Sequence, residues 1–475
     1  MSTPAPTTDF PDWLSPMVVK ELRQGMRTKL FVGIFIVLQV LMTLNVAVGL
    51  LTAAGQSNAQ ASNVVFWVMV AVPVLLVLPL TGMNAVSNEI KMNTLELIFL
   101  TPVSAWRIIA GKWLAIVGQA VLLVSAVLPY AVLRYFIGGV NLWQELISLA
   151  LLLVASAVLT AAAVGFSPYQ TRLTRVLVSV GVVIVVQGAI PLAFYSSRSV
   201  VGGSSLAGLP LLGAVLVLVG IVLFLMFEFG ASKIAPPAED HSWKKRSLAA
   251  LLLLLAAGVS FAAANTEWFT LLTGVLILGV CLDALAEQPR LIPSIYHPFA
   301  RRGVAGRIAG RLLYPGWTSG VFFMLLMLAG FGSLWNSQGM LPNDFAWLGY
   351  FAFCGAILFP CAIVRLCFPR TQKAVGIFVA LQMVLIAITV VGNVLDMALK
   401  WNVRVLTSVF PTSAYILSAT GSGSRETLEL YLMTSVFLTI ASFAVLVVLA
   451  VRGWRQFRAM EDASLELATS NAELA

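Results

Sequence analysis

The sequence predicts an all-α fold, a polytopic helical membrane protein with about twelve transmembrane helices and an amphipathic helix before the first of them. Hydrophobic residues make up 60% of the 475 residues, charged residues only 10%, and the mean hydropathy is +0.95. These values lie far above those of a soluble domain. Apolar stretches of about 20 residues recur along the whole chain, and each is long enough to cross the hydrocarbon core as a helix.

The distribution of positive charge supports this count. The expected spans have the approximate limits 30–54, 62–83, 113–137, 142–166, 173–195, 206–230, 248–264, 268–285, 317–335, 345–368, 372–396 and 428–451. An even count places both termini on one side. If that side is the cytosol, only five of the 29 lysines and arginines lie elsewhere, namely Arg134, Arg198, Lys400, Arg404 and Arg425. Such a bias follows the positive-inside rule, so we expect a multi-pass protein of the plasma (inner) membrane with both termini cytosolic. The net charge of +9 then reflects topology, and nucleic acid is not an expected partner.

The chain is expected to begin with a disordered stretch, 1–14, followed by a short helix. Ser15 and Pro16 form a start signal, a capping residue followed by proline at the first helical position. Val18, Leu22, Met26 and Leu30 then recur every four residues, with Lys20, Arg23, Gln24 and Arg27 on the other face. This pattern predicts an amphipathic helix that lies in the inner interface of the membrane.

The polar segment 84–112 interrupts the spans on the side where positive charge gathers. We expect two short helices there. The first runs over 87–100, with Glu89 in its first turn, where the helix dipole favours an anion. Thr101-Pro102 interrupts it, because proline disfavours a helical residue before it. Ser104 caps the second helix, which continues into the third span. About 29 residues is long for a simple reversal between helices, so we expect this segment to contact another molecule.

The middle of the chain predicts a cytosolic linker at 231–247, which carries Pro236-Pro237 and Lys244-Lys245-Arg246. It divides the chain into a first membrane domain, 15–230, and a second, 248–458, each with about six spans. A cytosolic tail, 459–475, follows. Before the ninth span, Val304, Ile308 and Leu312 recur every four residues. This repeats the amphipathic-then-span order of the N-terminus.

Signals of catalytic or metal chemistry are absent from the sequence. There is no GxxxxGK[ST] phosphate loop, no GxSxG elbow and no HExxH helix. The two histidines, His241 and His297, are too few for a catalytic zinc site. The four cysteines form no CxxC pair and lie in expected spans, where they serve as small packing residues. Charged residues inside spans, such as Arg134, Glu145 and Asp283, fall near span ends, where their side chains reach the interface. We therefore expect no enzyme activity, catalytic residue, cofactor or metal.

Three stretches carry a resemblance to a known family. The residues from Pro16 to Arg23 have the form P-x-x-x-K-E-L-R. Glu89 is followed by Asn93-Thr94-Leu95-Glu96, a leucine-rich run and Thr101-Pro102-Val103-Ser104, and Gly111-Lys112 precedes the third span. Together they resemble the membrane permeases of the ATP-binding-cassette (ABC) transporter type-2 export family, which typically show an acidic residue, G-T-L-E, T-P-x-S and G-K at these places. The match covers about residues 15–140.

The resemblance implies an elbow helix in the membrane plane and a coupling-helix segment, 84–112, that docks in a cleft of a separate ATPase subunit. The elbow residues would be Lys20, Glu21, Leu22 and Arg23. The residues of ATPase coupling would be Glu89, Lys91, Thr94, Leu95, Glu96, Thr101 and Pro102. The basic cytosolic loops make membrane lipids a further expected partner. The oligomeric state is open, because twelve spans could form one complete pathway, whereas a six-span functional core would require a permease dimer. The implied function is ATP-driven export.

Other functions remain open at this stage. A two-half secondary transporter fits the span count and the long middle loop, but the sequence lacks obvious intramembrane ion-coupling residues. A membrane enzyme acting on lipids would need a cluster of histidine, acidic or serine residues at one face. A non-transporting membrane assembly subunit is a further alternative. The sequence does not identify a substrate.

Overall fold

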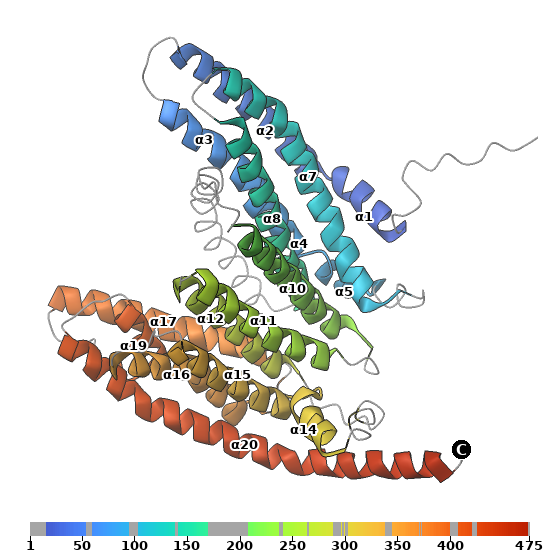
Figure 1. The fold of residues 1–475 in the computed structure, drawn as a ribbon, viewed down its shortest axis with the longest axis vertical. Coiled ribbons are helices and arrows are strands. Elements are labelled where there is room, and N and C mark those ends of the chain that lie inside the picture. The colour runs from blue at the N-terminus through green and yellow to red at the C-terminus, as the bar shows by residue number, and fades with distance from the viewer. Residues whose placement is uncertain are drawn as a thin grey trace, which may run out of the picture. The chain divides into compact units, whose positions relative to one another are not determined.

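The computed structural model is helical in every regular element that it describes (Figure 1). It describes residues 16–53, 59–94, 103–137, 141–169, 208–236, 241–263, 266–287, 296, 299, 303–337, 344–369, 371, 373–399, 407–419 and 425–473. The chain divides into two compact units, Met1–Ala235 and Pro236–Ala475, called here the first and the second unit. The expected all-α class is confirmed.

Eight helical stretches of the described chain are long and apolar enough to cross a membrane. They are Lys29–Leu50, Asn63–Lys91, Ala105–Ile137, Leu142–Phe166, Trp317–Leu334, Gly349–Cys367, Ala374–Asp396 and Glu429–Trp454. Each coincides with one of the twelve expected spans. The expected span 173–195 lies outside the described residues, and those at 206–230, 248–264 and 268–285 fall in helices that are not among the eight. The chain is thus a multi-pass helical membrane protein, and the count of twelve stays a prediction.

The described part of the first unit contains five long helical segments and two short helices. Its elements are α1 (Pro16–Met26), α2 (Lys29–Ala53), α3 (Ala59–Ala71), η1 (Val72–Val77), α4 (Leu78–Gly82), α5 (Ser87–Lys91), α7 (Ala105–Ile137), α8 (Leu142–Phe166) and α10 (Gly208–Ile234). The start of α7 directly after Ser104 agrees with the sequence prediction, and α1 is described from Pro16 onward. Proline is favoured at the first position of a helix and serine at the position before it.

The second span of the first unit is irregular in its middle. Here α3 passes into the π-helix η1, which has Pro73 near its start, and then into α4, which has Pro79 near its start. Proline lacks the backbone N–H that would bond a preceding carbonyl. A side chain from α8 satisfies one carbonyl of this stretch, because the Ser156 hydroxyl donates to the Val74 carbonyl at 2.7 Å. Serine residues commonly satisfy such freed groups within membranes.

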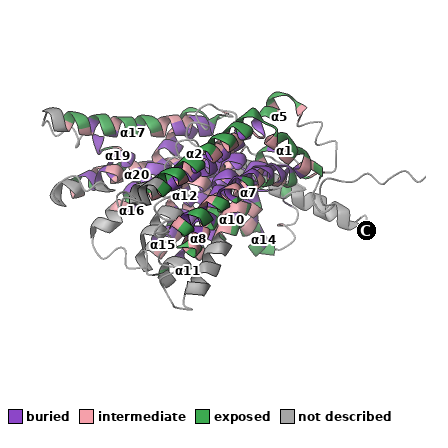
Figure 2. Cartoon of the chain, turned by 90° about the horizontal axis from the view of Figure 1, so that it is seen from above, coloured by how far each residue is buried: buried purple, intermediate pink, exposed green. Residues whose placement is uncertain are grey.

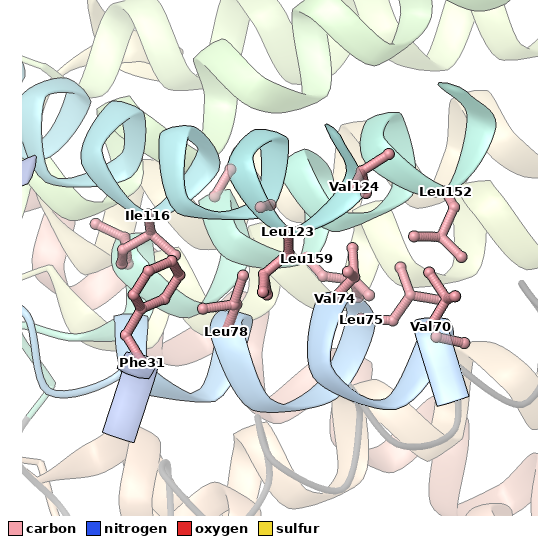
Figure 3. Packing of buried hydrophobic residues seen from close by; sticks show 14 of the residues in the cluster. Phe31, Val70, Val74, Leu75, Leu78, Ile116, Leu123, Val124, Leu152 and Leu159 are labelled. Carbon is pink, nitrogen blue, oxygen red and sulfur yellow. The ribbon is translucent and has the colours of Figure 1, made fainter. Parts of the chain in front are cut away.

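The core of the first unit lies where α2, the second span, α7 and α8 meet. Figure 3 shows side chains from these helices pointing toward one another, among them Phe31, Leu78, Ile116 and Leu159. The helices α8 and α10 approach each other most closely at two glycines. A Cβ on Gly165 would lie 2.5 Å from the Met226 carbonyl oxygen, and one on Gly230 would lie 3.0 Å from Gly165. Small residues at such crossings let membrane helices pack backbone to backbone.

The second unit has eight described helices. They are α11 (Ser242–Ala263), α12 (Thr266–Ala286), α14 (Gly303–Leu313), α15 (Trp317–Ser337), α16 (Asp344–Cys367), α17 (Ala374–Leu399), α19 (Pro411–Ala419) and α20 (Arg425–Glu473). Within this unit α16 packs against α19 and α20, and α15 packs against α12. Parts of the expected linker 231–247 are helical, since α10 continues to Ile234 and α11 begins at Ser242. The expected tail 459–475 continues α20 as far as Glu473.

Exposed residues on several helices are large and apolar, which is the reverse of a soluble surface. Figure 2 shows exposed residues along α2 and α17. On α2 they include Val32, Ile36, Val37, Val40 and Leu44, and on α17 Val384, Val390, Val391 and Val394. Contiguous apolar surface of this extent indicates contact with lipid or another helix. These faces accordingly belong to the hydrocarbon region.

Candidate functional site

The helix α1 lies along the first half of α7, and glycines on α7 allow the close approach. A Cβ on Gly111 would meet Val18 at 3.6 Å and Met17 at 3.8 Å, and one on Gly118 would meet Leu22 at 3.1 Å. The apolar side of the amphipathic helix therefore packs on protein. Its position in the membrane plane, as the elbow prediction has it, stays a prediction.

One buried lysine joins three separate helices. Lys112 on α7 donates from Nζ to Glu89 Oε1 of α5 at 2.7 Å and to Glu21 Oε1 of α1 at 3.2 Å. The Lys112 side chain is only 4% exposed, while Glu89 and Glu21 are 16% and 19% exposed. These three residues, called here the Lys112 triad, come from the three stretches that carry the family resemblance. A charge removed from water needs such partners, because an unpaired buried charge is costly.

The helix α5 is held at its start and stops after five residues. The Ser167 hydroxyl, just beyond the end of α8, accepts from the N–H groups of Val86 at 2.9 Å and Ser87 at 3.2 Å. The helix expected over 87–100 is interrupted after Lys91, where α5 ends, and its residues 95–100 lie outside the described residues. The reason lies in Asn93, which has φ of +55° and so leaves the right-handed helical region. Asparagine is, after glycine, among the residues that best tolerate this conformation.

The predicted coupling residues divide into inward and outward groups. Glu89 is directed to Lys112 and belongs to the interior, although the sequence placed it with docking residues. Lys91 is exposed, as is Met92, with 73% of its surface accessible. Thr94 is half-buried, and its hydroxyl donates to the Glu89 carbonyl at 3.3 Å. Leu95, Glu96, Thr101 and Pro102 lie outside the described residues.

The predicted elbow residues divide in the same way. Lys20 and Arg23 are exposed, whereas Glu21 and Leu22 are half-buried against α7. Sequence reasoning missed the part played by Ser167, and no spacing or composition around it could have revealed that part. The pairing of Glu21 with Lys112 had a weak signal, because both residues lie in resembling motifs.

The second unit contains a buried ion cluster at the ends of α11, α12 and α14. Lys245 donates to Asp283 and, at 3.0 Å, to Glu287, and Arg246 donates to Glu287 at 2.6 Å. Arg246 also donates to the carbonyls of Leu312, Tyr314 and Gly316, at 2.6, 2.8 and 3.2 Å, and so fixes the corner between α14 and α15. The sequence placed Lys245 and Arg246 in a cytosolic linker. In the structure both lie in α11 and are buried, with exposures of 4% and 2%.

The charge of Glu287 is fixed by this cluster. Burial alone would raise the pKa of the Glu287 carboxyl, but the charges of Arg246 and Lys245 lower it from 4.5 to about 2. Hydrogen bonds from the Ser242 hydroxyl at 2.6 Å and the Gly316 N–H at 2.9 Å act in the same direction. Burial likewise opposes the charge on Lys245, yet its two acidic partners raise the pKa of that ammonium group. Glu287 and Lys245 therefore remain ionised over the physiological range.

In the first unit, another ion pair joins the end of α7 to the start of α8. Arg134 Nη1 lies 2.7 Å from Glu145 Oε1, and Arg134 Nη2 donates to Asn63 Oδ1 at 2.7 Å. Both charged residues were expected to reach the interface from span ends. They are instead buried, with 8% and 5% exposure, and pair with each other. Pairing removes the cost of burying each charge alone.

The described part of the chain offers no cluster of three or more histidine, cysteine, aspartate or glutamate side chains placed to hold a metal ion. In the first unit, the short helix α5 is bonded through Glu89 to the buried Lys112, which lies near the start of the long helix α7. Comparison of the chain with known protein families, curated proteins and solved structures finds no match.

Proposed function

We propose that this chain is the transmembrane permease subunit of an ATP-driven exporter of the ABC type-2 kind, and that a separate ATPase subunit drives it. The observation that carries the proposal is the Lys112 triad. Three stretches singled out by their family-like motifs, far apart in the sequence, meet at one buried ammonium group. A fold that only reversed the chain between two spans would not need this convergence.

The proposed mechanism transmits force from the coupling segment to the membrane helices. The ATPase subunit binds the exposed side of the segment at Lys91 and Met92. Closure of the ATPase pair then moves α5. Because Glu89 is bonded to Lys112 at 2.7 Å, movement of α5 carries the start of α7 with it, and Glu21 carries α1. Substrate then passes outward between the spans of the inner membrane.

The alternatives explain less of the arrangement. A secondary transporter uses acidic groups that gain and lose an ion. In this chain the buried acids Glu145 and Asp283 are each paired with a base, Arg134 and Lys245. A non-transporting assembly subunit would share the ATPase docking and differ only in moving no substrate. Transport by the reconstituted complex separates the permease from that last alternative.

The decisive experiment is co-purification of the full chain with a candidate ATPase, encoded in a neighbouring reading frame. The test variant is Lys91→Glu with Met92→Asp, on the exposed side of the segment. The matched control is Phe136→Asp at the other end of α7, since Phe136 is 77% exposed and Met92 is 73% exposed. We expect the test variant to lose the ATPase and the control to retain it. Glu89→Arg is a poorer choice, because it also breaks the Lys112 triad.

Two outcomes would contradict the proposal. One is substrate transport by the purified chain in vesicles without any nucleotide-hydrolysing partner. The other is labelling of a cysteine introduced at Met92 from the exterior of intact cells, since the coupling segment must face the cytosol. In either case the chain would belong to another class of membrane protein.

A further inference from the structure

We propose that Lys20, Arg23 and Arg27 form a surface that binds the headgroups of anionic phospholipids. These three residues are called here the basic face of α1. The inference is independent of the proposed export function, because it concerns how the first unit sits on its membrane.

The basic face is a continuous strip. Its residues are spaced by three and four positions, which places them on one side of a helix. All three are exposed, and Arg27 directly follows α1 in a turn in which its N–H donates to the Gln24 carbonyl at 3.2 Å. Glu21, the acidic residue of α1, is half-buried on another side of the helix and accepts from Lys112.

The strip lies at the depth of lipid headgroups. The membrane helix α2 begins at Lys29, two residues after Arg27. Directly beyond Lys29 the exposed surface becomes apolar, with Leu30, Val32 and Ile36 exposed by 51%, 45% and 56%. A change from exposed cations to exposed aliphatic side chains within a few residues marks the boundary between the headgroups and the hydrocarbon core. The basic face stands on the polar side of this boundary.

The mode of binding follows from the packing of α1. Amphipathic helices at membranes usually insert their apolar side among the acyl chains. Here Met17, Val18 and Leu22 pack on glycines of α7, so that side is occupied by protein. Binding therefore depends on charge, falls with ionic strength, and requires a negative headgroup. A lipid bound here would also steady the helix whose other side holds Glu21 against Lys112.

The test uses the full chain, purified in a zwitterionic detergent and depleted of lipid. Phosphatidylglycerol, phosphatidylcholine or inorganic phosphate is added in turn, and binding is measured by the rise in the unfolding temperature and by native mass spectrometry. The triple variant is Lys20→Gln, Arg23→Gln, Arg27→Gln. The control removes the same charge from exposed positions of the second unit, with Lys373→Gln, Arg452→Gln and Arg458→Gln.

We expect phosphatidylglycerol to bind the natural chain and the control at 50 mM salt, and to bind far less at 500 mM. The triple variant should bind on the order of 100-fold more weakly, since each basic residue near an anionic surface contributes about fivefold. Phosphatidylcholine and inorganic phosphate should bind to none of the three proteins.

Equal binding of phosphatidylglycerol to the natural chain and the triple variant would overturn the proposal, as would equal losses in the triple variant and the control. Binding of inorganic phosphate alone at the same face would show a small-anion site instead. If lipid binding is unchanged while the triple variant alone loses a co-purifying protein, the face docks a protein and the proposal is wrong. The unfolding temperature without lipid shows that each variant is folded.

Discussion

Glu89 and Lys112 lie 23 residues apart in the sequence and are joined by a 2.7 Å hydrogen bond from Nζ to Oε1. The bond crosses from α5 to α7, over a stretch that includes the residues 95–102 that the structure does not describe. The bond fixes the position of α5, which follows the second span, relative to the start of α7, which is the third span. The shared bond to Glu21 adds α1 to the same point, so Lys112 joins three elements.

Replacement of Lys112 by methionine should destabilise the first unit. The variant leaves two carboxylates, on Glu21 and Glu89, close together and largely buried without a base. Breaking such a pair from one side typically costs about 3 kcal/mol. The free energy of unfolding is measured by denaturant titration in detergent. The control is Lys91→Met, because Lys91 is exposed on α5, the short helix that carries Glu89.

A rescue distinguishes this charge effect from poor packing of the new side chain. Adding Glu21→Gln and Glu89→Gln to Lys112→Met removes both uncompensated charges and should restore a large part of the lost stability. If Lys112→Met is as stable as Lys91→Met, the triad does not hold α1, α5 and α7 together, and the mechanical argument for coupling fails with it.

Local signals in the sequence predicted the helices, whereas long-range contacts escaped it. Pro16 and Ser104 predicted the starts of α1 and α7, since proline and capping residues favour the start of a helix at the residues next to them. Three acceptors of Arg246 gave no such signal. They are the backbone carbonyls of Leu312, Tyr314 and Gly316, about 70 residues further along the chain, and every residue carries a carbonyl. Lys245 and Arg246 consequently looked like ordinary linker charges.

Asn93 is expected to tolerate glycine and to reject a β-branched residue. Its φ of +55° is open to glycine and unfavourable for valine by roughly 1–2 kcal/mol. Asn93→Gly should therefore keep the turn after α5, and Asn93→Val should loosen it. Hydrogen exchange of the amides in α5 reports the change directly. Asn88→Val, at an exposed helical position of α5, is the control and should alter exchange much less.

The preference at position 93 also bears on the family resemblance. The resembling motif has glycine where this chain has Asn93, and a left-handed backbone explains why these two residues can exchange. If Asn93→Gly loosens α5 as much as Asn93→Val does, the left-handed turn is not what the motif requires there. The sequence could not reveal the turn by itself, because asparagine is also common in right-handed helical and extended positions.

Acid should weaken the second unit through Glu287. The pKa of this carboxyl is about 2 in the folded chain and 4.5 ordinarily, because the positive charges of Arg246 and Lys245 outweigh its burial. A lowered folded pKa means that the contribution of Glu287 is fully present above about pH 4.5 and is lost as the pH falls toward 2. The unfolding temperature, measured across this window, should fall more steeply for the natural chain than for Glu287→Gln.

The stability difference between the natural chain and Glu287→Gln should depend on pH. At pH 7 the Glu287→Gln variant should be less stable than the natural chain, because Arg246 and Lys245 lose a buried counter-charge. The difference should narrow as the pH drops below 4.5. A difference that is constant from pH 7 to pH 3 would show that the Glu287 carboxylate does not carry its charge into the fold, and that the corner between α14 and α15 is held by Arg246 alone.

Substitution of Gly165 should separate α8 from α10. A Cβ at Gly165 would lie 2.5 Å from the Met226 carbonyl oxygen, and that backbone atom cannot rotate away as a side chain can. The helices must move apart, which typically costs about 1–3 kcal/mol. Gly230→Ala acts on the same crossing from the other helix and should have a similar effect, since its Cβ would lie 3.0 Å from Gly165.

The matched control is Gly220→Ala on α10, where no atom lies within 4 Å of the new Cβ. Alanine there should be neutral or stabilising by up to about 1 kcal/mol, because glycine is the poorer helix former. Unfolding temperatures of the three variants in one detergent decide the matter, and equal stability of Gly165→Ala and Gly220→Ala would mean that α8 and α10 do not cross at these glycines.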